Sequence, residues 1–189
     1  LVFTLTNYSG SEIQKQRRGR KLYFVDGAVR NAALQRGIAP ARDSTEMGLL
    51  LENMAAGHLH ALHKHSGVRI HYWRDKTEEV DLIYDHPESQ LAFEIATSAD
   101  HPRAGLVALK NRYRKFKGRC FLVSPEVHPM LPSDSPDGIG TLPFELFLLA
   151  VSAQAGRELA QRLGIPHTPE APQRAVAPTT TTGLTVNSS

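Results

Sequence analysis

Three carboxylates of the sequence stand among apolar residues, where a buried charge is costly unless a partner compensates it. Glu52 has small or apolar neighbours three and four positions away, which predicts that it points toward the core side of a helix. Asp81 interrupts the strand-like segment 80–84, and Glu94 interrupts the segment 92–96. If these two segments pair as a hairpin, Asp81 and Glu94 lie on adjacent strands and can face the same way.

Two close anions repel each other, so we expect a positive charge between Asp81 and Glu94. Mg²⁺ would serve, because carboxylate oxygens are the ligands that hard divalent cations prefer. Glu52, Asp81 and Glu94 are therefore candidate metal ligands and candidate catalytic residues. The structural alternative is a set of buried acids that backbone amides or arginines satisfy, and the residue types alone leave both interpretations open.

Basic residues lie on both sides of this acidic stretch. Residues 15–21 hold five basic side chains of seven, residues 75–100 hold eight carboxylates, and residues 103–119 hold seven basic groups and no acid. A helix over the last segment could bind phosphates through charge, and the alternative is a solvated helix face. The candidate nucleic-acid-binding residues on it are Arg103, Lys110, Arg114 and Lys117.

The composition excludes several classes of function. A net charge of +3 is too small for a polycationic, histone-like role, and the single cysteine, Cys120, excludes an internal disulfide framework and a multi-cysteine zinc site. The longest apolar run, 146–151, is far shorter than the roughly 20 residues that span a bilayer, and the N-terminus shows no signal peptide. We therefore expect a cytoplasmic protein with no membrane partner. Because the chain starts at Leu1 inside a strand-like run, we also expect a fragment whose front half is missing.

The hydrophobic patterns predict an α/β domain, a mixed sheet with helices packed on it. Its core order is α-β-β-β-α-β, with the three middle strands as an antiparallel meander. The expected strands are 22–25, 69–74, 80–84, 90–95 and 120–123. The expected helices are 28–35 after Asp26, 47–64 with Ser44 or Thr45 as N-cap, 103–116, and a last one that begins near 144 and continues to 163. The tail 165–189 is rich in Pro and Thr and is expected to be disordered.

Six short segments, in this order, resemble a known family. It is the C-terminal domain of unknown function attached to bacterial and archaeal AAA-type ATPases, which is similar to the restriction-endonuclease-like, PD-(D/E)xK, superfamily. The segments are Lys-Leu-Tyr-Phe-Val-Asp at 21–26, Gly-Leu-Leu-Leu-Glu-Asn at 48–53, Tyr-Trp-Arg at 72–74, Glu-Val-Asp-Leu-Ile at 79–83, Phe-Glu-Ile at 93–95 and Phe-Leu-Val-Ser-Pro at 121–125. Together they cover about residues 21–150.

The resemblance implies a restriction-endonuclease-like fold over residues 21–164. It makes Glu52 the helical acid, Asp81 the first strand acid and Glu94 the acid of the E-x-K pair. In active nucleases of this superfamily the acids hold Mg²⁺, and the lysine helps to position or activate water. Here Ala96 stands where that lysine should be.

With Ala96 in place of the lysine, the resemblance is compatible with three functions. We favour a nucleic-acid-binding or regulatory domain in which hydrolysis is lost, because an aliphatic residue offers no substitute chemistry. The first alternative is an active Mg²⁺-dependent nuclease that uses Lys110 or Arg103 as a displaced basic residue. The second is a protein-interaction module that binds no nucleic acid.

The resemblance also implies partners outside the domain. Residues 1–14 resemble the closing strand of a winged-helix segment, so residues 1–20 would be the end of that segment and a basic linker. An ATPase module would lie further upstream in the same polypeptide, and DNA is the implied ligand. The chain contains no G-x-x-x-x-G-K-[ST] motif, so this fragment does not bind ATP by that route.

Overall fold

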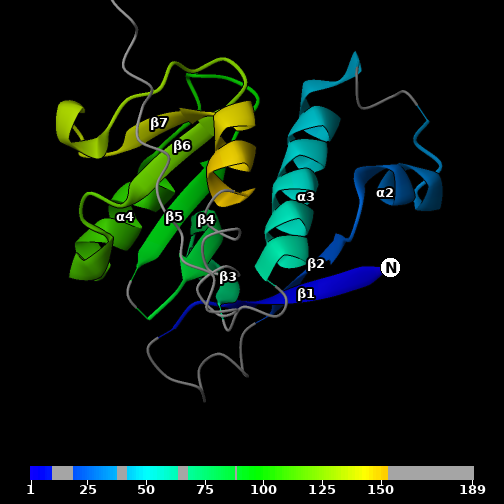
Figure 1. The fold of residues 1–189 in the computed structure, drawn as a ribbon, viewed down its shortest axis with the longest axis horizontal. Helices are drawn as coiled ribbons and strands as arrows, with labels where there is room; N and C mark the ends of the chain where they lie inside the picture. The colour runs from blue at the N-terminus through cyan, green and yellow to red at the C-terminus, as the bar shows by residue number, and fades with distance from the viewer. Residues whose placement is uncertain (10–18, 38–41, 64–67, 88, 153–189) are drawn as a thin grey trace, which may run out of the picture.

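The fold is built on one mixed sheet of seven strands in the order β2-β1-β3-β4-β5-β6-β7 (Figure 1). The computed structural model describes residues 1–9, 19–37, 42–63, 68–87 and 89–152. The strands are β1 (Val2–Asn7), β2 (Arg20–Phe24), β3 (Arg69–Asp75), β4 (Glu78–Asp85), β5 (Gln90–Ile95), β6 (Cys120–Ser124) and β7 (Gly140–Pro143). β3, β4 and β5 pair antiparallel, whereas β6 and β7 join in parallel. The predicted α/β class and the predicted meander are confirmed.

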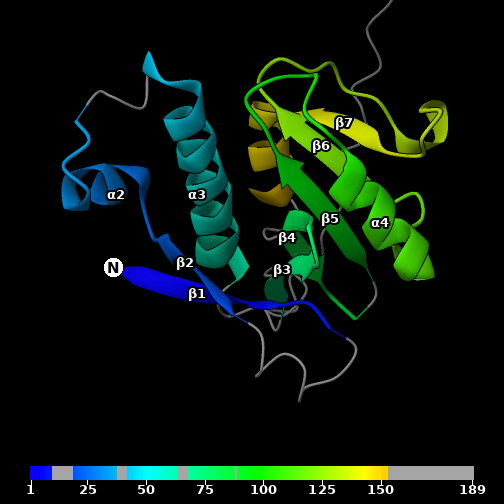
Figure 2. The same ribbon diagram turned by 180° about the vertical axis from the view of Figure 1, so that it is seen from behind.

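Helices cover both faces of this sheet. The helices are α2 (Gly27–Ala33), α3 (Ser44–His63), α4 (Ala104–Arg112), the short η2 (Arg114–Phe116) and η3 (Pro132–Asp134), and helical residues 144–152. Figures 1 and 2 show α3 and helix 144–152 on one face and α4 on the other. None of the helices described has the length and apolar character needed to cross a bilayer.

Each face of the sheet has its own hydrophobic core. On the α3 side, Leu59 and Phe147 from the two helices meet Phe93 of β5. On the other side, Leu106 and Leu109 of α4 meet a cluster that includes the buried Val80 of β4. α4 lies very close to β4, because Gly105 has no side chain to keep its backbone away from the carbonyl of Glu79.

Several boundaries differ from the predicted ones for local reasons. α3 begins earlier than expected, because Asp43 rather than Ser44 or Thr45 accepts the amide of Glu46, at 2.9 Å. The helix predicted over 103–116 breaks at Tyr113, whose φ of −124° and ψ of 100° are extended, and a short η2 follows. β7 was not predicted from the sequence.

The N-terminal strand belongs to the same sheet as the rest of the domain. β1 pairs antiparallel with β2 over Val2–Thr6 and parallel with β3 at Thr6 and Asn7. Residues 2–7, which the resemblance assigned to a preceding segment, thus lie between β2 and β3 in this sheet. The predicted basic stretch 15–18, the continuation of the last helix through 163 and the tail 165–189 lie outside the described residues.

Candidate functional site

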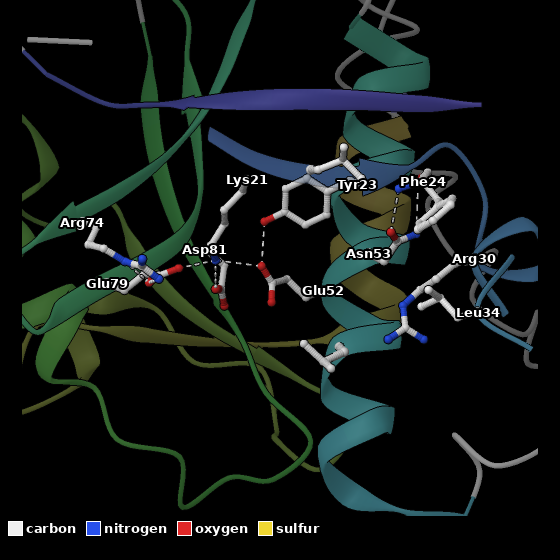
Figure 3. Close-up of a pocket in the computed structure, with 12 residues that line it drawn as sticks. Lys21, Tyr23, Phe24, Arg30, Leu34, Glu52, Asn53, Arg74, Glu79 and Asp81 are labelled. Atoms are coloured by element: carbon white, nitrogen blue, oxygen red, sulfur yellow. Dashed lines mark hydrogen bonds and ion pairs between the residues drawn. The ribbon is translucent and has the colours of Figure 1, made fainter. Parts of the chain in front are cut away.

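A lysine that the sequence arguments did not single out joins the predicted acids. The ammonium of Lys21 lies 2.8 Å from Glu52 Oε1 and 3.1 Å from Asp81 Oδ1, and it also contacts Glu79 Oε1. Figure 3 shows Lys21 between α3, which carries Glu52, and β4, which carries the other two acids. We call Lys21, Glu52, Glu79, Asp81 and Glu94 the acid cluster.

β2 and α3 hold the first half of this cluster. Lys21 pairs with Leu5 of β1, and Tyr23, two residues further along β2, faces the same way. The Tyr23 hydroxyl donates a 2.6 Å hydrogen bond to Glu52 Oε1, the oxygen that also accepts from Lys21. Glu52 therefore has two donors on one oxygen, and its side chain is only 18% exposed, as its apolar helical neighbours predicted.

Asp81 lies where β4 and β5 separate. The ladder between the two strands runs from Asp85 and Gln90 to Leu82 and Phe93 and stops there. Beyond it, Asp81 Oδ2 accepts the backbone amide of Ile95 at 3.0 Å. A side chain thus takes a hydrogen bond that a strand carbonyl would otherwise accept, and the strands open at this point.

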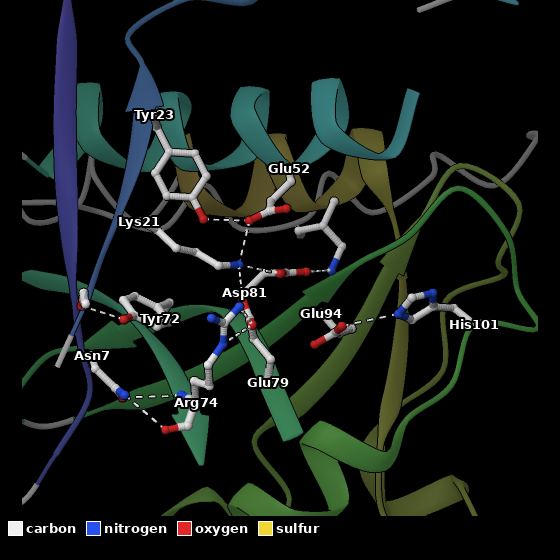
Figure 4. Close-up of polar contacts among 12 residues, drawn as sticks. Asn7, Lys21, Tyr23, Glu52, Tyr72, Arg74, Glu79, Asp81, Glu94 and His101 are labelled. Atoms are coloured by element: carbon white, nitrogen blue, oxygen red, sulfur yellow. Dashed lines mark hydrogen bonds and ion pairs between the residues drawn. The ribbon is translucent and has the colours of Figure 1, made fainter. Parts of the chain in front are cut away.

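Glu94 extends the cluster along β5. Its Oε1 lies 3.2 Å from His101 Nε2, in the segment between β5 and α4 (Figure 4). Its Oε2 is buried and has no hydrogen-bond partner among the described residues. An ionised oxygen in that position is unfavourable unless a cation or a proton compensates it.

Burial and like charge set the protonation of these acids. Burial, followed by the charges of Glu94 and Glu52, raises the pKa of Asp81 well above its usual value. Burial also raises the pKa of Glu94, although the hydrogen bond from His101 opposes this shift. That same bond raises the pKa of His101. Burial alone would lower the pKa of Lys21, but the charges of Asp81 and Glu52 raise it above its usual range, so Lys21 stays protonated.

The acids outnumber the cations that contact them. Three cations among the described residues contact the four acids. Arg74 pairs with Glu79, and His101 pairs with Glu94. Lys21 contacts Glu52, Asp81 and Glu79. Glu52 and Asp81 therefore share one cation, Lys21. The cluster has room for one further positive charge.

The acid cluster opens into a cleft of about 530 Å³ (Figure 3). One wall carries Lys21, Glu52, Glu79 and Asp81, together with Arg74. The lining also includes apolar and basic residues, namely Leu22, Phe24, Arg30, Leu34 and Leu49. The volume is in the range of pockets that take small ligands or a single nucleotide unit.

Asn53 closes the edge of β2 beside this cleft. Its Oδ1 accepts the amide of Phe24 at 2.9 Å, and its Nδ2 donates to the carbonyl of Phe24 at 3.1 Å. The side chain thus satisfies both backbone groups of an edge residue, as a neighbouring strand would. This fixes β2, and with it Lys21, against α3.

The three predicted metal ligands do not act as one set. No group of three or more His, Cys, Asp or Glu side chains that could hold a metal ion is found among the residues described. Glu52 is engaged by Lys21 and Tyr23, whereas Asp81 and Glu94 lie on adjacent strands. Two carboxylates are a common protein contribution to a Mg²⁺ site, where waters and substrate oxygens complete the shell. The buried Oε2 of Glu94, which has no hydrogen-bond partner among the described residues, and Asp81, which shares its cation with Glu52, fit such an ion.

The predicted basic residues of α4 are not part of the acid cluster. Arg103 lies 3.2 Å from Asp137 Oδ2, and the ammonium of Lys110 donates to the carbonyl of the same residue. Arg114 and Lys117 are exposed in and just after η2. Neither Lys110 nor Arg103 contacts Glu94 in the described structure, so the lysine missing at position 96 is not supplied from α4.

Lys21, Tyr23, Glu79 and His101 are the site residues that sequence reasoning missed. A signal for Lys21 was present, because it opens the family-like segment 21–26 and shares a strand face with Tyr23. Lys21 is also the last residue of the basic run 15–21, where a lysine is unremarkable. His101 gave no signal beyond its position seven residues after Glu94.

The comparison with protein families gives a match over part of the chain, to a domain whose function is unknown. Residues 47–134 match the family described as Domain of unknown function (DUF4143). This range contains Glu52, Asp81 and Glu94 but begins after Lys21. No curated protein and no solved structure matches the chain. The function must therefore be argued from the acid cluster itself.

Proposed function

We propose that this chain is a cytoplasmic nucleic-acid-binding or regulatory domain of an AAA-type ATPase, built on a restriction-endonuclease-like site that no longer cleaves. The observation that carries the proposal is the acid cluster. Glu52 of α3 and Asp81 of β4 line one cleft, and Glu94 lies on the adjacent strand β5. Ala96 is buried beside Leu122 and Val127, where a nuclease has lysine. The DUF4143 match covers all three acids and gives no activity.

The charge of the cluster determines how nucleic acid could bind. The cluster holds four acids and three cations, so a phosphate beside Asp81 and Glu94 is repelled unless a further cation enters. Binding at the cleft must therefore depend on a divalent ion held by Asp81 and Glu94. Binding through exposed basic residues such as Arg114 and Lys117 would need no metal.

This difference provides the test. The affinity of the chain for duplex and single-stranded DNA is measured over a range of salt concentrations, in EDTA and in Ca²⁺. We expect binding that requires Ca²⁺, weakens with salt, and is lost in Asp81→Asn and Glu94→Gln. Binding that is equally strong in EDTA and that disappears in Arg114→Ala/Lys117→Ala would move the interface to η2. No binding in any condition would overturn the proposal and favour a protein-interaction module that docks on the upstream ATPase.

A second function, Mg²⁺-dependent cleavage, is favoured by two features of the same cluster. The buried Oε2 of Glu94 has no partner among the described residues, and Lys21 brings a protonated ammonium to the acids in spite of Ala96. A bound Mg²⁺ would polarise the scissile phosphate and activate water. The chain's own part would be to hold that ion with Asp81 and Glu94 and to keep the amide of Ile95 fixed on Asp81.

Cleavage assays separate the two functions. An active site would cut DNA in Mg²⁺ or Mn²⁺, would be inactive in Ca²⁺ or EDTA, and would lose activity in Asp81→Asn with binding in Ca²⁺ measured in parallel. Absence of cleavage in wild type under every metal, together with metal-dependent binding, supports the non-cleaving domain. Cleavage that survives Asp81→Asn would identify a contaminating nuclease.

A further inference from the structure

Lys21 is the described cation that contacts two of the three predicted site acids at once. Its ammonium lies against Glu52 Oε1 and Asp81 Oδ1, and these acids come from different elements, 31 and 60 residues away along the chain. The Tyr72 ring lies 5.7 Å from the ammonium and closes another side. The side chain is 20% exposed, so the ammonium is held inside the cluster while it still borders the cleft.

We propose that Lys21 is the positioning residue of this site: from β2 it supplies the positive charge that the lysine of an E-x-K pair would supply from position 96. The inference rests on the proposed role of the acid cluster in handling nucleic acid, and it applies whether or not the site cleaves. Lys21 acts through the acids, because its ammonium contacts Glu52 and Asp81 together and so holds the helical acid beside the strand acid next to Glu94.

The surroundings of position 96 support this relocation. Ala96 follows Glu94 by two residues and is 3% exposed, in contact with Leu122 and Val127. A lysine there would replace a small side chain in an apolar contact. With an ammonium already held by Glu52 and Asp81 from the β2 side, the site has its positive charge without one.

The other cations near the sheet have different partners. His101 contacts Glu94, Arg74 contacts Glu79, and Lys110 and Arg103 contact residue Asp137. Each of these pairs involves one acid or carbonyl. Among the described residues, only Lys21 links the helical acid to a strand acid, which is the arrangement that a positioning charge requires.

The test compares variants of the whole chain by two measurements that a merely structural salt bridge would not separate. In Lys21→Met, the loss of a charge beside Asp81 should strengthen Mn²⁺ binding by about tenfold, while DNA binding in Ca²⁺ should weaken by about tenfold. Lys21→Arg keeps the charge and should preserve both affinities. Lys76→Met is the matched control, because its exposed side chain lies in the turn between β3 and β4, outside the acid cluster, and it should change neither affinity.

Opposite changes in the two affinities support the proposal, whereas unchanged or parallel changes overturn it. If circular dichroism shows that Lys21→Met does not fold, the variant Lys21→Met/Ala96→Lys tests whether a positive charge at position 96 can replace that of Lys21. Recovery of folding and of DNA binding in Ca²⁺ supports a charge that can act from either strand, and failure to recover them overturns it. If wild type binds no DNA, the proposed function fails separately. The Mn²⁺ affinity then decides the role of Lys21: a gain in Lys21→Met supports it, and no gain overturns it.

Discussion

The stability of Lys21→Met tests how the acid cluster is compensated. The substitution keeps the length of the side chain and removes its charge, so Glu52 and Asp81 are left buried beside each other. Removing one partner of a buried ion pair costs about 3–5 kcal/mol. Lys21, Glu52 and Asp81 retain 20%, 18% and 12% exposure, which places the expected loss near the lower end, at about 3 kcal/mol. Urea unfolding at about pH 7 in EDTA measures it.

The dependence of this loss on pH is a sharper test. Burial and like charge raise the pKa of Asp81, and without Lys21 only the hydrogen bond from the amide of Ile95 opposes that shift. The folded variant then takes up a proton at a higher pH than the unfolded chain does. Its free energy of unfolding should therefore rise as the pH falls from about 7 to about 5, and the deficit relative to wild type should shrink.

The double variant Lys21→Met/Asp81→Asn provides the control. The introduced asparagine would carry no charge and can still accept the amide of Ile95, so the double variant should recover about 1–2 kcal/mol of the loss. A deficit below about 1 kcal/mol in Lys21→Met, or a deficit that does not change with pH, would refute the view that Lys21 compensates buried, ionised acids.

Two further predictions concern the support of the cluster. A Cβ added at Gly105 would overlap the carbonyl of Glu79, so Gly105→Ala should lower the free energy of unfolding in urea by about 3 kcal/mol. Gly48→Ala has space within α3 and should raise that free energy by up to about 1 kcal/mol; similar effects in both variants would contradict the close approach of α4. His101→Ala removes the hydrogen bond that opposes the effect of burial on Glu94, so NMR titration in EDTA should show a higher pKa of the Glu94 carboxyl. An unchanged or lower pKa would show that His101 does not govern this acid.

The parts of the fold that could be predicted from sequence are those set by local pattern. The alternation of segment 90–95 gave β5 its bounds, and Asp26 capped α2 as expected, since its Oδ1 accepts the amides of Ala28 and Val29. The pairing of β1 with β3 was not predictable in this way. It joins residues 65 positions apart, as Thr6 and His71 illustrate, and periodicity carries no information on such contacts.

The acids of the site were predictable because each is a charged residue within an apolar sequence pattern. Lys21 was not predictable in this way. Glu52 and Asp81 stand out as charges within apolar patterns. Lys21 stands at the end of a basic run, where a lysine is unremarkable. Lys110 is the nearest candidate base to Glu94 in sequence, but in a mixed sheet the neighbours of a strand are decided by strand order and helix crossings.

The energetics of the cluster favour a functional origin over a structural one. Buried ion pairs contribute little net stability, and apolar replacements of similar volume are often neutral or stabilising. A cluster kept for stability alone would be expected to balance its charges, yet here Asp81 shares Lys21 with Glu52 and Glu94 leaves one buried oxygen without a hydrogen-bond partner among the described residues. Both uncompensated features lie on the adjacent strands β4 and β5, where the strands open beside the cleft. An arrangement that is unfavourable in isolation, and that one added cation would satisfy, is what a site that binds a divalent ion and a phosphate requires.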